Sequence, residues 1–220
     1  MKSVAFGLVL AAVLTGFSGA AVQAAPVPSA VKAVESSAED LVDFALSGDR
    51  PGMAATAARL TAVANGPAAS SLTRSGVSSA KIVELELAAN RAARLAAHGS
   101  FVRVALAANA VSGLMPGLYA HFHDRVPPSV LALDYFDREA QLRSLVHERK
   151  QVGVSVKRLA STWVRLRPTV VAAGGAAAAA AYDKHVAAMK RFLHGGLKSV
   201  REEAIHGLAL VDQLEHVFTR

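Results

Sequence analysis

The chain has no cysteine, few aromatic residues and no runs typical of β-strands. Without Cys it cannot form disulfides, thiolate metal sites, covalently attached c-type haem or a catalytic thiolate. Aromatic residues make up 5% of the chain, and strand-like alternation of β-branched or aromatic residues with polar ones is missing. We therefore predict an all-α fold.

Common catalytic motifs are absent as well. The sequence contains no Gly-x-Ser-x-Gly nucleophile elbow, no His-Glu-x-x-His zinc motif and no glycine-rich loop suited to a phosphate. We therefore expect a binding or accessory protein without enzymatic activity.

Residues 1–24 have the pattern of a secretory signal peptide. A basic start at Lys2 precedes an apolar run, Val4–Leu14, and small residues lead to Ala24. Polar residues and glycines interrupt the stretch too often for a membrane anchor of about 20 apolar residues. We expect cleavage after Ala24 and export, which means the periplasm in a Gram-negative host.

Glycine, proline and small polar clusters divide the remainder into about eight helical segments. We expect these helices at Ser29–Leu46, Pro51–Ala64, Ser79–Ala97, Ser100–Phe122, Ser129–His147, Lys150–Arg167, Ala176–Leu193 and Leu197–Phe218. Asn65-Gly66-Pro67 is expected to end the second helix, and Gly99 to cap the third. Pro116 should bend or break the fourth, because its ring clashes with the preceding turn.

The two halves of the chain carry matching ladders of apolar or small residues. Seven positions from Phe101 to Phe122 advance in steps of 3 and 4, and so do seven from Leu197 to Phe218, offset by 96 residues. Such steps place side chains on one helix face. We therefore predict an antiparallel bundle of two related four-helix units, at residues 25–123 and 129–220. Chance is the alternative, because 52% of the residues are hydrophobic.

Basic residues concentrate in the second half. Between Arg143 and Arg201 there are 12 Lys or Arg residues against two acids. This surface predicts binding of an unidentified acidic protein or anionic ligand, with contact to a membrane surface as one form of it. The candidate binding residues are Lys157, Arg158, Arg165 and Arg167. Nucleic acid is not an expected partner of an exported protein, and simple solubility is the alternative explanation.

Histidine and methionine suggest the alternative function, a metal- or haem-binding bundle. His185 and Met189 are spaced i, i+4 and could hold a metal or a non-covalent haem. His121 and His123 could hold a divalent cation near a helix end. Core packing and a favourable helix dipole are the simpler explanations of these residues, so we expect no cofactor.

Two further sets of polar residues could form a site or a structural contact. Glu203 and His206 form a Glu-x-x-His pair, but the second such pair that a di-iron bundle needs is missing. A hydrogen-bonded or ion-paired cluster could form at the junction of the two units, or its members could lie in solvent. Its candidate members are Asn90, Asn109, Asp134, Tyr135, Arg138 and Glu139.

Overall fold

The computed structural model describes residues 25–220, and the predicted signal peptide lies outside the described residues. Within 25–220 the regular structure is helical, with one isolated bridge between Pro26 and His123 and no strand, so the all-α prediction is confirmed. The elements are α1 (Ser29–Ser47), α2 (Arg50–Val63), the π-helical turn η1 (Ala64–Ala68), α3 (Ala69–Arg74), α4 (Ser79–His98), α5 (Phe101–Ser112), α6 (Met115–Tyr119), α7 (Pro128–Leu145), α8 (Arg149–Ala172), α9 (Ala176–Phe192) and α10 (Leu197–Thr219).

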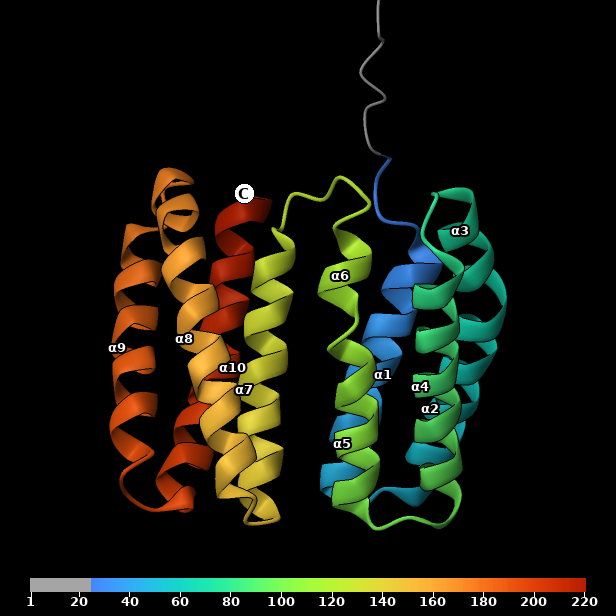
Figure 1. Cartoon of the computed structure of the whole chain (residues 1–220), viewed down its shortest axis with the longest axis horizontal. Helices are drawn as coiled ribbons and strands as arrows, with labels where there is room; N and C mark the ends of the chain where they lie inside the picture. Colours follow the sequence, from blue (N-terminus) through green and yellow to red (C-terminus); the bar gives the residue numbers. More distant parts are fainter. Residues whose placement is uncertain (1–24) are drawn as a thin grey trace, which may run out of the picture.

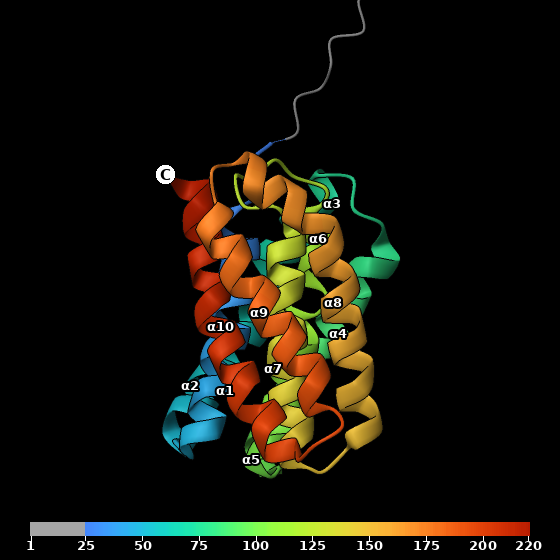
Figure 2. The ribbon, with the colours of Figure 1, turned by 90° about the vertical axis from the view of Figure 1, so that its left-hand side faces the viewer.

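The helices pack side by side with their long axes roughly aligned (Figure 1). Helices α1 and α4 each contact α2 and α5, whereas α7 and α9 each contact α8 and α10. Helix α7 also contacts α5 and α6, which joins the earlier helices to the later ones. Figure 2 shows the molecule from the side of α8 and α9, which lie away from α1 and α2.

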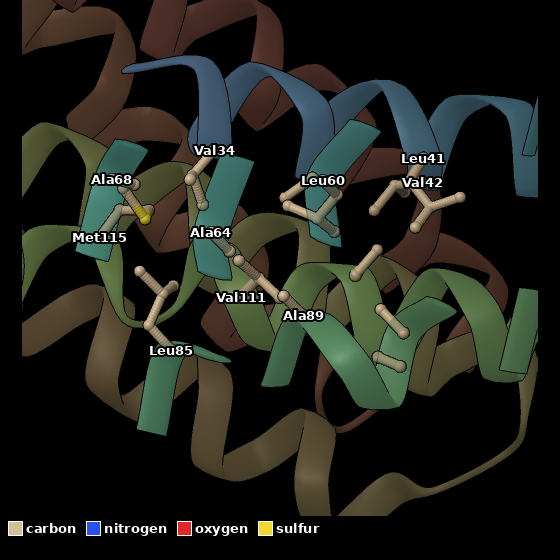
Figure 3. Packing of buried hydrophobic residues seen from close by; sticks show 14 of the residues in the cluster. Val34, Leu41, Val42, Leu60, Ala64, Ala68, Leu85, Ala89, Val111 and Met115 are labelled. Carbon is tan, nitrogen blue, oxygen red and sulfur yellow. The ribbon is translucent and has the colours of Figure 1, made fainter. Parts of the chain in front are cut away.

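The predicted ladder positions form the core. In the earlier helices Leu60, Leu85, Val111 and Met115 point toward one another (Figure 3) and are fully buried. In the later helices the buried ladder positions of α10 are Val200, Ala204, Gly207, Val211 and Leu214. The same 3–4 spacing relates the buried residues Val152, Val156, Leu159 and Trp163 on α8, and Tyr182, Val186 and Met189 on α9. The 3–4 spacing thus predicts correctly which helix faces avoid water.

Two prolines that were expected to lie at or beyond helix ends lie inside continuous helical segments. The prediction that Asn65-Gly66-Pro67 ends a helix is wrong, because η1 carries the chain through Pro67 into α3. A π turn is wider than an α turn and leaves room for the proline ring, which explains the continuity. Helix α8 likewise extends past Arg167, through Pro168, to Ala172.

The other predicted interruptions occur where expected. The fourth helix is broken between Ser112 and Met115, and Pro116 lies in the first turn of α6. Helix α4 ends at Gly99, but this glycine has φ −80° and does not form the expected left-handed cap. By length and hydropathy Phe101–Tyr119 could cross a membrane, yet half of that segment is buried within the fold, as in a core helix.

Candidate metal centre

Three potential metal ligands meet between α9 and α10. His185 on α9 and Glu203 on α10 lie with Nδ1 and Oε1 2.9 Å apart, and the same Oε1 is 3.5 Å from His206 Nδ1. Among residues 25–220 this is the one group of three His, Cys, Asp or Glu residues whose ligand atoms all lie within 4.8 Å of one another. The sequence thus places a two-histidine, one-carboxylate set in one small volume.

Local helix geometry brings these side chains together. Glu203 and His206 are three residues apart on α10, so both project from the same side of that helix. His185 reaches them because α9 and α10 pack against each other. Its side chain is buried, whereas that of His206 is mostly exposed, so the set runs from the interior to the surface.

A glycine makes the close approach possible. Gly207 follows His206 on α10, and a Cβ atom there would lie 2.5 Å from both Asp137 Oδ2 and the His185 ring. Real Cβ atoms do not approach other heavy atoms so closely. The missing side chain at this core position therefore leaves the space that the Asp137 and His185 side chains occupy.

The second ring nitrogen of His185 is held by a buried carboxylate. Asp137 on α7 has no exposed side-chain surface, and its Oδ1 lies 2.9 Å from His185 Nε2. The hydroxyl of Tyr182 donates to Asp137 Oδ2 at 2.9 Å. Metal-binding histidines commonly give their other ring N–H to a carboxylate in this way, which fixes the ring and its tautomer. The arrangement leaves Nδ1 facing Glu203 and His206.

The electrostatics of this cluster favour positive charge at its centre. Burial alone would lower the pKa of His185, but the hydrogen bonds and charges of Asp137 and Glu203 outweigh it and raise the pKa. Burial and the Asp137 carboxylate raise the pKa of Tyr182 well above its ordinary value, so its hydroxyl stays a neutral donor. The site is therefore one in which two carboxylates stabilise a cation.

Two of the three spacings between ligand atoms are close to those around a small tetrahedral ion. Bonds of about 2.0–2.1 Å at tetrahedral angles separate neighbouring ligand atoms by about 3.4 Å. The two ligand distances that involve Glu203, 2.9 and 3.5 Å, bracket this value. A pocket of about 430 Å³ lies over the three side chains and is also lined by Lys184 and Arg191. A fourth ligand could approach from that side.

The other residues predicted to bind metal lie elsewhere. Met189 is fully buried in an apolar cluster with Val152 and Val156, and is not a member of the three-ligand group. His121 is exposed, its Nε2 lies 3.2 Å from the ammonium nitrogen of Lys81, and it is not a member of the three-ligand group. His123 is also exposed, and the neighbouring Asp124 forms an ion pair with Lys32 at 2.9 Å. Of the predicted set, only His185 lies in the centre.

The four predicted anion-binding residues are all exposed on α8, but they point in different directions. The Nε–H of Arg167 donates to both carboxylate oxygens of Asp183, and Lys157 lines a shallow pocket next to Lys190. Arg158 and Arg165 are seven residues apart and so share a helix face, whereas Arg167 lies on the opposite side from Arg158. The structure does not bring the four cations together.

The predicted polar junction is present where α5 meets α7. Asn109 donates to Glu139 Oε2 at 2.8 Å, and Glu139 also accepts from Arg143 at 2.7 Å. Asp134 lies 3.4 Å from Arg138 one helical turn later. These contacts tie the earlier helices to α7 through polar groups.

Sequence reasoning identified the pair Glu203 and His206 but did not connect it to His185. The two residues lie next to the buried positions Ala204 and Gly207, so the site is at the edge of the core. Asp137 was not recognised, since nothing in the sequence marks a buried carboxylate within a helix. The signal that could have found the site was the glycine at a core ladder position.

Comparisons with known proteins add no family: no family model matches the chain, and no curated protein or solved structure is significantly similar to it.

Proposed function

We propose that this protein binds a divalent transition metal ion of the zinc type through His185, Glu203 and His206. The observation that carries the proposal is the placement of three potential ligand atoms within 4.8 Å, with the buried Asp137 holding the inner imidazole by its second nitrogen. If these three side chains had come together by chance, a buried carboxylate holding the second nitrogen of the inner imidazole would not be expected.

Ligand chemistry restricts the metal. Two imidazoles and one carboxylate suit Zn²⁺, whereas Ca²⁺ and Mg²⁺ prefer oxygen ligands alone. Zinc sites with three protein ligands keep a fourth position for water or another molecule. The pocket over the centre supplies room for that position.

The test is calorimetric titration of the purified, chelator-treated protein with Zn²⁺. The wild-type chain is expected to bind about one ion, and His206→Ala should lose at least tenfold in affinity, because it removes one of three ligands. His206 is largely exposed, so this change should leave the fold intact. His194→Ala, at an exposed histidine in the turn between α9 and α10, is the matched control. Equal zinc binding by both variants would refute the proposal.

A second candidate function, binding of an anionic ligand by the basic half, is supported beside the metal centre. Lys184 and Arg191 are exposed, line the same pocket and have no ion-pair partner among residues 25–220. They would favour an anion at the open metal position. Titration of the zinc-loaded protein with inorganic phosphate tests this, since Arg191→Gln removes the positive charge without adding a metal ligand and should weaken phosphate binding while zinc binding is retained. A variant that keeps normal phosphate binding, or that loses zinc binding as well, would count against this function.

Export of the protein and an internal duplication of its helices are the remaining parts of the proposal. The pattern of residues 1–24 supports secretion to the periplasm. A metal site built from His and carboxylate ligands needs no cysteine, and the chain has none. The burial of corresponding ladder positions, such as Val111 with Gly207 or Met115 with Val211, supports two related four-helix units. N-terminal sequencing of protein from the native host tests the first part, with Ala25 as the expected first residue.

A further inference from the structure

A second polar site lies between the earlier and later helices. Five carboxylates line a pocket of about 110 Å³ where α1, α7 and α10 meet. We call it the acidic pocket, and its carboxylates are those of Glu35, Glu39, Asp134, Asp212 and Glu215. It is separate from the metal centre, whose ligands lie on α9 and α10.

The positive charge in the acidic pocket does not balance these groups. Arg138 is the one basic residue in the lining, and its ion pairs are long, 3.4 Å to Asp134 and 3.5 Å to Asp43. Its Nε is buried without a hydrogen-bond partner among the described residues. Tyr119 donates a hydrogen bond to Glu35, but no such donor reaches the carboxylates of Glu39 and Glu215 within residues 25–220. The carboxylates of the pocket therefore outnumber the cations and hydrogen-bond donors that would stabilise them as anions.

An independent observation also indicates a missing partner. Ser112, at the end of α5, is 5% exposed and lines the same pocket. Its hydroxyl oxygen is buried and has no hydrogen-bond partner in the described chain. Buried hydroxyl groups nearly always have a partner, because burying an unpaired polar group is unfavourable. A ligand within the pocket would satisfy it.

We propose that the acidic pocket binds a hard divalent cation, Ca²⁺, partly through bound water. Carboxylate and hydroxyl oxygens are the ligands that Ca²⁺ prefers, and it accepts six to eight of them in flexible geometry. A volume of about 110 Å³ also has room for water, at about 30 Å³ per molecule. A cation here would link α1 to α7 and α10, and so couple the two halves of the protein.

The raised pKa values of the glutamates that line the acidic pocket agree with this geometry. Burial first, and then the neighbouring Asp134 carboxylate, raises the pKa of Glu39 to about 8 and that of Glu215 to about 7. Burial likewise raises the pKa of Glu35. Without a cation the pocket relieves its repulsion by taking up protons, and a cation does the same by direct attraction.

The test is calorimetric titration of the chelator-treated full chain with Ca²⁺ at neutral pH, together with thermal unfolding. We expect about one bound Ca²⁺ and a higher Tm in its presence. The double variant Glu39→Gln/Glu215→Gln should lose at least tenfold in Ca²⁺ affinity while keeping its helical circular dichroism. Its Tm without Ca²⁺ should equal or exceed that of the wild type, because like charges have been removed. Glu84→Gln/Glu202→Gln, at two exposed carboxylates, is the matched control and should bind Ca²⁺ normally.

Two results would overturn the proposal. One is the absence of Ca²⁺ binding by the folded wild-type chain, and the other is equal binding by the pocket variant and the control. The variant His206→Ala separates this site from the metal centre, since it should bind Ca²⁺ like the wild type even if it has lost Zn²⁺. Loss of Ca²⁺ binding in His206→Ala would place the Ca²⁺ at the metal centre and contradict the acidic pocket.

Discussion

Asp137 and His185 form a hydrogen bond of 2.9 Å between Oδ1 and Nε2 at a point where neither side chain is exposed to solvent. The two residues come from α7 and α9, which are separated by 48 positions in the sequence. Burying such a pair is unfavourable unless each group finds further partners. Tyr182 and Glu203 supply them, so a stable polar chain extends from the interior of the later helices to the surface.

Gly207→Ala should damage this pair directly. The added Cβ would meet Asp137 Oδ2 and the His185 ring at 2.5 Å, and both groups are confined. We expect a loss of about 1–3 kcal/mol in unfolding free energy, the usual cost of overpacking, and weaker zinc binding. Chemical denaturation measures the first effect. Gly153→Ala on α8 is the control, because the added Cβ would meet nothing within 4 Å. This substitution should stabilise the protein by about 0.5–1 kcal/mol, since alanine favours a helix more than glycine does.

Tyr182→Phe should weaken the support of His185 while preserving the core. The ring remains packed against Trp163, but Asp137 loses the hydroxyl that donates to it. We expect a loss of about 1–3 kcal/mol in stability, since a fully buried acceptor loses its donor. Tyr135→Phe should have a smaller effect, because no hydrogen bond of the Tyr135 hydroxyl is present among residues 25–220. A Tyr182→Phe protein as stable as Tyr135→Phe would show that the Asp137 contact contributes nothing.

Stability should fall as pH rises above the acidic range in metal-free buffer. Glu39 and Glu215 have folded-state pKa values of about 8 and about 7, against 4.5 for an ordinary glutamate. A carboxyl group whose pKa is higher in the folded state favours folding while it is protonated. Its contribution is complete below about pH 4.5 and is lost as pH rises through about 7 and 8. The raised pKa of His185 acts in the same direction.

Thermal unfolding between about pH 5 and about pH 9 tests this dependence. The wild-type Tm should decline across the range, and Glu39→Gln should make the decline shallower because one titrating group is removed. A Tm that rises with pH, or an identical slope in the variant, would contradict the assignment of these two glutamates.

The sequence predicted the buried faces better than the helix ends. Steps of 3 and 4 identify positions such as Met115 and Val211, which are 0% and 1% exposed, because burial follows directly from helix periodicity. The end assigned to Asn65-Gly66-Pro67 was wrong because a proline stops an α-helix but can be accommodated by a local π turn. That accommodation depends on the packing around η1, which local sequence rules do not include.

The metal centre was only partly predictable for a related reason. Glu203 and His206 belong to one helix, so their spacing is visible in the sequence. Their proximity to His185 and Asp137 depends on how α7, α9 and α10 pack, which periodicity does not determine. The same holds for the acidic pocket, where Glu39 and Glu215 are 176 positions apart.

X-ray absorption at the zinc edge of the zinc-loaded protein tests the metal centre most directly. We predict a first shell of nitrogen and oxygen ligands at about 2.0–2.1 Å, with two imidazoles in the wild type and one in His206→Ala. A shell with the same number of imidazoles in the wild type and in His206→Ala, or one without imidazole, would contradict it.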